Sequence, residues 1–267
     1  MLKDITLGQF FPGDTLLHRL DPRTKLILVV IYIAALFIAK SYISYAVMVA
    51  FLVLSISLSN VKVVTLLKSI KPLAIIIIIT ALLNIFYTPG RTLVKFWIFN
   101  ITWEGLRSAA FMAARIIMLI MGTFLLTYTT SPIALTDGIE LLLNPLKKIK
   151  VPVHELAMMM AIALRFIPTL IEETDKIMSA QKARGADFET GNIFARAKAL
   201  VPILVPLFIS SFRRADELAV AMECRCYHGG EGRTRLKQLH YQKRDCFAIA
   251  FGCLILAAVI VLRVFGL

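Results

Sequence analysis

Two arginines share a local pattern that would suit a specific polar contact. When Arg184 is aligned with Arg225, an offset of 41 residues, Asp175 and Asp216 fall on each other nine positions earlier, and a glycine-containing break follows each arginine. An arginine near a helix C-terminus is favoured by the helix dipole, and a following glycine is the usual left-handed cap, so helix termination alone explains one copy. A duplicated pattern also suits two equivalent docking sites, because the guanidinium is planar and always charged.

Other reactive side chains do not form a recognisable catalytic set. Cys224, Cys226 and His228 could hold a soft metal, but they supply only three ligands, and thiols near a helix end are common. His154-Glu155 lacks the second histidine of a metalloprotease helix, and the chain has no G-x-x-x-x-G-K-[S/T] phosphate-binding loop. A membrane-anchored enzyme would need a base and a nucleophile, and the four histidines reveal no such pairing. We expect no catalysis, no metal and no cofactor bound by this chain.

The composition points to a membrane rather than to nucleic acid. The 267 residues are 58% hydrophobic and only 18% charged, yet the formal net charge is +13. Soluble domains are about 45–50% apolar and about 25% charged. Residues 1–25 contain three aspartates and two prolines without a continuous apolar stretch, so they do not form a signal peptide. All four cysteines lie in the last fifth of the chain, which is not a disulfide framework.

The hydrophobic stretches predict an all-α integral membrane protein with about five transmembrane helices. The expected spans are residues 26–39, 42–59, 72–87, 108–128 and one within 245–267. The first holds only 14 residues, fewer than the ~20 that cross a bilayer, and needs Lys25 and Lys40 to reach the two interfaces. Arg91–Arg107, with Trp97, suits an interfacial hairpin. Arg115 is either a functional intramembrane charge or a snorkelling side chain.

The segment 131–244, which precedes the last span, has a different character. It is rich in charges but contains apolar stretches at 157–164 and 201–212, so we expect long amphipathic helices under the membrane. Pro168, Pro202 and Pro206 would kink these helices or mark their starts. With the N-terminus (1–25) inside, the segments on the cytoplasmic side hold 24 of the 30 basic residues, as the positive-inside rule requires. We therefore expect residues 1–25 and 131–244 to be cytoplasmic.

Several motifs together resemble a known family. They are Leu17-His18-Arg19-Leu20-Asp21-Pro22-Arg23-Thr24-Lys25, Thr129-Thr130-Ser131-Pro132, Asn144-Pro145-Leu146, Val151-Pro152, Leu164-Arg165-Phe166-Ile167-Pro168 and Ala180-Gln181-Lys182-Ala183-Arg184-Gly185. Over almost its whole length the chain resembles the transmembrane T component of energy-coupling factor (ECF) transporters, a branch of the ABC importers. That family carries two Ala-Arg-Gly-type triplets at the ends of two coupling helices.

The resemblance implies which residues would dock onto ATPase subunits. Ala183, Arg184 and Gly185 match the first triplet, whereas Cys224, Arg225 and Cys226 keep only the arginine of the second. We expect Gly229-Gly230 to replace the missing glycine as the cap of that helix.

The resemblance also implies the protein's partners and its place in the cell. It implies a non-catalytic scaffold in the cell membrane, in contact with lipid and not with nucleic acid. The implied partners are two ABC-type ATPase subunits, which bind ATP and Mg²⁺, and a small membrane subunit that binds the substrate, a vitamin or metal ion. The expected contacts with that small subunit are Ala157, Met159, Leu164, Val201, Leu204 and Phe208. A self-sufficient channel or secondary carrier is the alternative, and the absence of carboxylates from the predicted spans counts against it.

Overall fold

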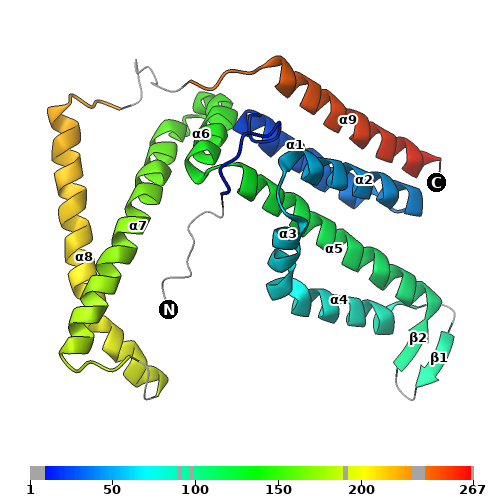
Figure 1. The fold of residues 1–267 in the computed structure, drawn as a ribbon, viewed down its shortest axis with the longest axis horizontal. Coiled ribbons are helices and arrows are strands. Elements are labelled where there is room, and N and C mark those ends of the chain that lie inside the picture. Colours follow the sequence, from blue (N-terminus) through cyan, green and yellow to red (C-terminus); the bar gives the residue numbers. More distant parts are fainter. Residues whose placement is uncertain (1–9, 90–91, 97–98, 189–191, 230–237, 266–267) are drawn as a thin grey trace. The chain divides into compact units, whose positions relative to one another are not determined.

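The computed structural model describes residues 10–89, 92–96, 99–188, 192–229 and 238–265, which are mostly helical (Figure 1). The chain divides into two compact units. Of the described residues, the larger unit comprises those within 10–138 and 239–265, and the smaller unit comprises those within 139–238.

The larger unit contains most of the helices and one hairpin. Its elements are α1 (Pro22–Ile38), α2 (Tyr42–Ser59), α3 (Val63–Ile70), the 3₁₀ turn η1 (Lys71–Leu73), α4 (Ala74–Tyr87), β1 (Thr92–Phe96), β2 (Phe99–Thr102), α5 (Trp103–Thr129), the first half of α6 (Pro132–Leu143) and α9 (Lys243–Val264). The antiparallel hairpin β1–β2 lies where an interfacial hairpin is expected, although Trp97 falls outside the described residues.

Helix α1 begins four residues before the predicted span. Its start is set by Asp21, whose carboxylate accepts a hydrogen bond from the Arg23 N–H, and by Pro22, whose missing N–H costs nothing in the first turn. Helix α2 has the predicted bounds, 42–59, because Ser41 caps its first turn and Asn60 ends it in a left-handed conformation.

Five described stretches are long and apolar enough to cross a membrane: α2, the α3–α4 stretch Val63–Tyr87, α5, α7 (Val153–Ala183) and α9. The architecture is therefore that of an all-α membrane protein. Two details differ from the sequence-based interpretation. With 17 residues, α1 is shorter than these five, and α7, which we expected under the membrane, has the length and composition of a span.

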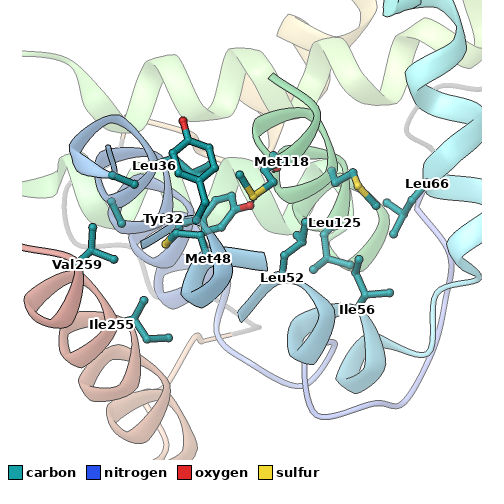
Figure 2. Packing of buried hydrophobic residues seen from close by; sticks show 14 of the residues in the cluster. Tyr32, Leu36, Met48, Leu52, Ile56, Leu66, Met118, Leu125, Ile255 and Val259 are labelled. Carbon is teal, nitrogen blue, oxygen red and sulfur yellow. Dashed lines mark hydrogen bonds between the residues drawn. The ribbon is translucent and has the colours of Figure 1, made fainter. Parts of the chain in front are cut away.

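The core of the larger unit lies where α1, α2, α5 and α9 meet (Figure 2). Tyr32 of α1 is 5% exposed, and its hydroxyl donates to the carbonyl of Met118 on α5 at 3.1 Å. Gly122 lies so close to the Tyr32 ring that a side chain there would overlap it. Small residues allow such close helix contacts in membranes. Many large apolar side chains on the outside remain exposed, as expected for lipid-facing helices.

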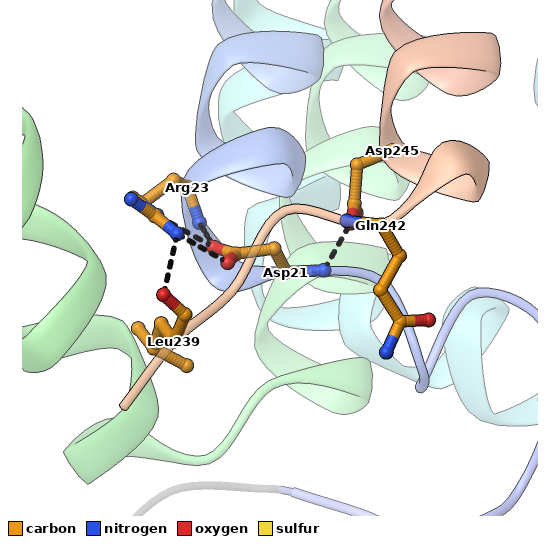
Figure 3. A network of polar contacts seen from close by, with 5 residues as sticks. All are labelled: Asp21, Arg23, Leu239, Gln242 and Asp245. Carbon is orange, nitrogen blue, oxygen red and sulfur yellow. Dashed lines mark hydrogen bonds and ion pairs between the residues drawn. The ribbon is translucent and has the colours of Figure 1, made fainter. Parts of the chain in front are cut away.

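A polar cluster ties the start of α1 to the start of α9 (Figure 3). The Asp245 carboxylate is buried and accepts hydrogen bonds from the N–H groups of Asp21 and Gln242, each at 2.8 Å. Arg23 binds the Asp21 carboxylate at 2.8 Å and the Leu239 carbonyl oxygen at 3.1 Å. We call these five residues the polar clamp. It joins segments more than 200 residues apart in sequence.

Lys25 extends this polar region to the end of α5. Its ammonium group donates to the Thr129 carbonyl oxygen at 2.8 Å and to the Thr130 hydroxyl at 3.2 Å, and the residue is 6% exposed. Burial lowers the pKa of Lys25 to about 8, although the charges of Asp245 and Asp21 act in the opposite direction. The motif that ends at Lys25 and the motif that begins at Thr129 therefore contact each other through the Lys25 side chain.

Candidate functional site

The residues expected to dock partner proteins lie on two long helices of the smaller unit, α7 and α8 (Ile193–Cys224). The short 3₁₀ helix η2 (Asn144–Ile149) precedes them. Pro168, Pro202 and Pro206 all lie inside these helices, so of the two expected roles, a kink or a helix start, the structure excludes the start. Figure 1 shows α8 changing direction part-way along its length. A proline removes one backbone hydrogen bond and crowds the preceding turn, which bends a long helix without ending it.

Helices α7 and α8 pack against each other in antiparallel orientation. Near the middle of the pair, Glu173 forms an ion pair with Arg214 at 2.6 Å and accepts a hydrogen bond from the Ser210 hydroxyl at 3.2 Å. Near the start of α7, the Tyr227 hydroxyl, just beyond α8, contacts the Met158 sulfur at 3.0 Å. The sequence interpretation missed the Glu173–Arg214 pair, although these two residues are separated by the same offset of 41.

The C-terminus of α7 forms a complete Schellman motif. The Gly185 N–H donates to the Lys182 carbonyl at 3.0 Å, and the Ala186 N–H donates to the Gln181 carbonyl at 3.0 Å. Gly185 has φ +88°, a left-handed conformation that glycine adopts readily. Arg184 is the last residue before this reversal and is exposed.

The C-terminus of α8 has the same hydrogen bonds with a different residue at the reversal. The Cys226 N–H donates to the Glu223 carbonyl at 2.8 Å, and the Tyr227 N–H donates to the Met222 carbonyl at 3.1 Å. Cys226 itself is left-handed, with φ 55°. The expectation that Gly229-Gly230 supplies this cap is therefore wrong.

The two triplets are thus equivalent in structure although they differ in sequence. Ala183 and Cys224 end their helices, Gly185 and Cys226 reverse the chain, and all six triplet residues are exposed. Gly229 is also left-handed, with φ +96°, but it lies beyond the hydrogen bonds that close the helix, and Gly230 lies outside the described residues.

Because the helices are antiparallel, the two arginines lie at opposite ends of the pair. Tyr227, close to Arg225, contacts Met158, and α7 then continues to Arg184. At a rise of 1.5 Å per residue, this length of helix separates the arginines by about 40 Å. The structure therefore has two similar helix ends far apart, and not a single site with two arginines.

The six residues expected to contact the substrate-binding subunit differ in accessibility. Met159, Val201, Leu204 and Phe208 are at least half exposed. Leu164 is partly buried, and Ala157 is only 3% exposed, so Ala157 packs inside the chain. Two of the exposed α8 positions, Leu204 and Phe208, belong to an apolar groove lined by Leu204, Val205, Phe208, Ile209, Phe212, Arg213 and Asp216. This spacing places the apolar residues on one face of α8, away from the face that packs against α7.

The thiols at the end of α8 have no metal-ligating partners among the described residues. Cys224 and Cys226 are exposed free cysteines, and His228 Nδ1 lies 2.9 Å from the Cys226 carbonyl oxygen. Within the described ranges, no three His, Cys, Asp or Glu side chains lie close enough together to hold a metal ion.

A second pair that the sequence interpretation missed joins α6 to α7. Glu140 and His154 lie 3.0 Å apart, between the carboxylate oxygen and the Nδ1 nitrogen. His154 belongs to the His-Glu dipeptide considered above for a metalloprotease, and the structure gives it a different partner. No local signal in the sequence pairs positions 140 and 154.

Comparison of the sequence with known proteins identifies the family of this chain. A family model described as "Cobalt transport protein" matches residues 13–236. The chain is 58% identical to the energy-coupling factor transporter transmembrane protein EcfT of Clostridium kluyveri, over 98% of this chain and 97% of that protein. It is 55% identical to the EcfT protein of Acidaminococcus fermentans over 99% and 97% of the two chains, and 49% identical to that of Bacillus subtilis over 97% and 98%. The chain therefore belongs to the family of transmembrane proteins of energy-coupling factor transporters, as a multi-pass membrane component.

Proposed function

We propose that this chain transmits ATP-driven motion from two ABC-type ATPase subunits to a small membrane subunit that binds a vitamin or metal ion. The ATPases would bind ATP and Mg²⁺ on the cytoplasmic side, and this chain would carry out no chemistry. Their approach on binding ATP, and their separation after hydrolysis, would move the ends of α7 and α8 relative to each other.

The observation that carries this proposal is the equivalence of the two helix ends. Arg184 and Arg225 are exposed, stand at the same position of the same capping motif, and lie about 40 Å apart along an antiparallel pair. Two equivalent charged ends suit two equivalent partner grooves lined by carboxylates or carbonyl oxygens. A single bound partner would not require two such ends.

The apolar groove on α8 supports the second half of the proposal. Phe208 and Phe212 are both more than 60% exposed, and their ring centroids lie 5.9 Å apart. An exposed apolar surface of this kind marks a protein or lipid contact. Since α8 carries both this groove and Arg225, movement of its docked end would also move the groove.

The arginines can be tested with a charge-matched control on the same pair of helices. In the complex purified with its ATPases, changing Arg184→Ala and Arg225→Ala together should abolish ATPase copurification or ATP-dependent uptake while leaving membrane insertion intact. Lys176→Ala on α7 removes one exposed positive charge away from the caps and from the groove, and it should have little effect. Normal ATPase binding and uptake in the double variant would contradict the assignment.

The moving groove requires a separate measurement. A cysteine introduced at Leu204, in a background without the natural cysteines, should change its crosslinking to the substrate-binding subunit between the ATP-bound and nucleotide-free states. Identical crosslinking in both states would show that the groove does not move with the ATPase cycle.

The cytoplasmic orientation of residues 1–25 and of the α7–α8 pair also belongs to the proposal, and the excess of basic residues in these segments supports it. In sealed inverted vesicles, a membrane-impermeant thiol reagent should label Cys226 without detergent. In right-side-out vesicles it should label Cys226 only after the membrane is opened, and labelling of the intact vesicles would reverse the assigned orientation.

A further inference from the structure

Three basic side chains gather around the turn between α1 and α2. Lys40 lies in the turn itself, and Arg107 and Arg115 reach it from α5. Arg115 Nε donates to the Tyr45 hydroxyl at 3.0 Å, and its Nη2 donates to the Ala39 carbonyl oxygen at 3.1 Å. Since a guanidinium carries five N–H groups, three of those on Arg115 remain for another acceptor.

Arg107 is held by aromatic rings instead of acceptors. Its guanidinium carbon lies 4.9 Å from the centroid of the Tyr42 ring and 5.5 Å from that of Phe111. These contacts use the face of the guanidinium and leave its N–H groups available at the edge. In the described part of the chain, no hydrogen bond or ion pair occupies those N–H groups.

The local charge is not balanced by carboxylates. Across the described ranges, no Asp or Glu forms an ion pair with Lys40, Arg107 or Arg115. The nearest acid on α5 is Glu104, one turn before Arg107, and it is partly buried. Even when Glu104 is counted, positive charge exceeds negative charge around the turn, and both Lys40 and Arg107 are exposed.

The position of this group along the helices indicates a membrane interface. Helix α1 starts at the polar clamp and ends at Ala39, whereas α5 runs in the opposite direction, since Lys25 contacts Thr129 and Arg115 contacts Ala39. The basic group therefore lies at the end of α1 away from the clamp. Large apolar side chains adjoin it, including Phe37 at 60% and Tyr42 at 65% exposed. Tyrosine and arginine beside an apolar surface are typical of the headgroup level.

We propose that Lys40, Arg107 and Arg115 bind the phosphate of an anionic phospholipid headgroup at the membrane face opposite the polar clamp. The available guanidinium N–H groups can donate paired hydrogen bonds to phosphate oxygens, and the adjoining apolar side chains of α1 and α2 would contact the acyl chains. The site is independent of the ATPase docking ends. It gives these three cations a role on the membrane face that the positive-inside rule leaves poor in basic residues.

The chain provides a matched control for this proposal in Arg263. Helices α1 and α9 run parallel, because Asp245 lies beside Asp21 and Gly252 lies against Leu28. Arg263, near the end of α9, is therefore at the same membrane face as Lys40, and it is exposed. Replacing it removes one positive charge from that face and leaves the three proposed phosphate ligands unchanged.

The test uses the full chain, delipidated in mild detergent and titrated with phosphatidylglycerol or phosphatidylcholine while bound lipid is counted by native mass spectrometry. We expect the natural chain to prefer phosphatidylglycerol. Lys40→Gln with Arg107→Gln should weaken phosphatidylglycerol binding roughly tenfold or more, at about fivefold for each basic residue, whereas Arg263→Gln should change it less than twofold. Arg107→Lys, which keeps the charge but not the paired donors, should fall between the double variant and the natural chain.

Several outcomes would overturn the site. They are equal affinity for the two lipids, unchanged binding in the double variant, or an equal loss in Arg263→Gln, which would indicate only the general charge of that face. Millimolar inorganic phosphate should not displace the lipid. Displacement by inorganic phosphate would show an anion site without a lipid requirement, and would refute the lipid assignment. Circular dichroism of each variant confirms that its helices are intact.

Discussion

The two cysteines that flank Arg225 should respond in opposite ways to the same substitution. Cys224 is the last residue of α8 and has helical geometry, whereas Cys226 is left-handed, with φ 55°. Glycine is unfavourable in the first environment and favourable in the second. The pair therefore tests the capping geometry without changing Arg225 itself.

The structure allows the size of the effect to be worked out. A non-glycine residue in the left-handed region costs roughly 1–2 kcal/mol, and glycine loses about 0.5–1 kcal/mol more backbone entropy on ordering. Cys226→Gly should therefore stabilise the helix end by about 1 kcal/mol. Cys224→Gly should destabilise it by about 0.3 kcal/mol, because in a helix glycine is about 1 kcal/mol and cysteine about 0.7 kcal/mol less favourable than alanine. The two variants should differ by about 1.3 kcal/mol, or roughly tenfold in a local opening equilibrium.

Hydrogen exchange followed by mass spectrometry can measure this difference in the purified full chain. The reporting amides are those of residues 226 and 227, which donate to the carbonyls of Glu223 and Met222. Cys226→Gly should slow their exchange about fivefold, and Cys224→Gly should speed it by a smaller factor, about 1.7. If both variants change exchange in the same direction, or Cys226→Gly leaves it unchanged, the capping motif at Arg225 is not the one described.

The remaining predictions concern the larger unit. Burial lowers the pKa of Lys25 from 10.5 to about 8, so the unfolded chain binds the ammonium proton more tightly than the folded chain, and the thermal midpoint should rise from pH 8 towards pH 10. Lys25→Met should flatten that rise, and an equal rise in the variant and the natural chain would contradict the prediction. Asp245→Asn should cost about 2 kcal/mol of stability by loss of a charge-assisted hydrogen bond, against almost nothing for the exposed Asp14→Asn; equal thermal shifts would argue against the clamp. Gly122→Ala should cost about 1–3 kcal/mol by overlap with the Tyr32 ring, and an unchanged unfolding midpoint would mean that α1 and α5 can separate freely.

The two helix ends that carry Arg184 and Arg225 could be predicted from sequence because helix ends carry local signals. The pattern that includes Ala183, Arg184 and Gly185 is contained within a few residues, and the second arginine follows at a fixed offset. The prediction of the residue that caps α8 after Arg225 was wrong. A cysteine seldom adopts positive φ, so the glycines further on were the better guess, but the backbone hydrogen bonds that close α8 require the reversal at Cys226.

Arg115 shows the limit of reading one helix at a time. Its depth in the predicted fourth span left a functional charge and a snorkelling side chain both open. In the structure, its hydrogen bonds go to Tyr45 and to the carbonyl oxygen of Ala39, the residue that caps α1. Neither partner has any signature in the sequence around Arg115, because the contact exists only once α1, α2 and α5 have packed.

The sequence by itself determined the all-α membrane class, the bounds of α2, the family and the position of the two helix ends that carry Arg184 and Arg225, because hydropathy, capping residues and motifs act over a few neighbouring positions. Only the tertiary structure decided which distant groups meet. The Asp21–Asp245 contact, the burial of Lys25 against Thr129 and the antiparallel register of α7 and α8 all depend on how whole helices pack. Packing energies are summed over many residues far apart in the chain, and so no local pattern specifies these pairs.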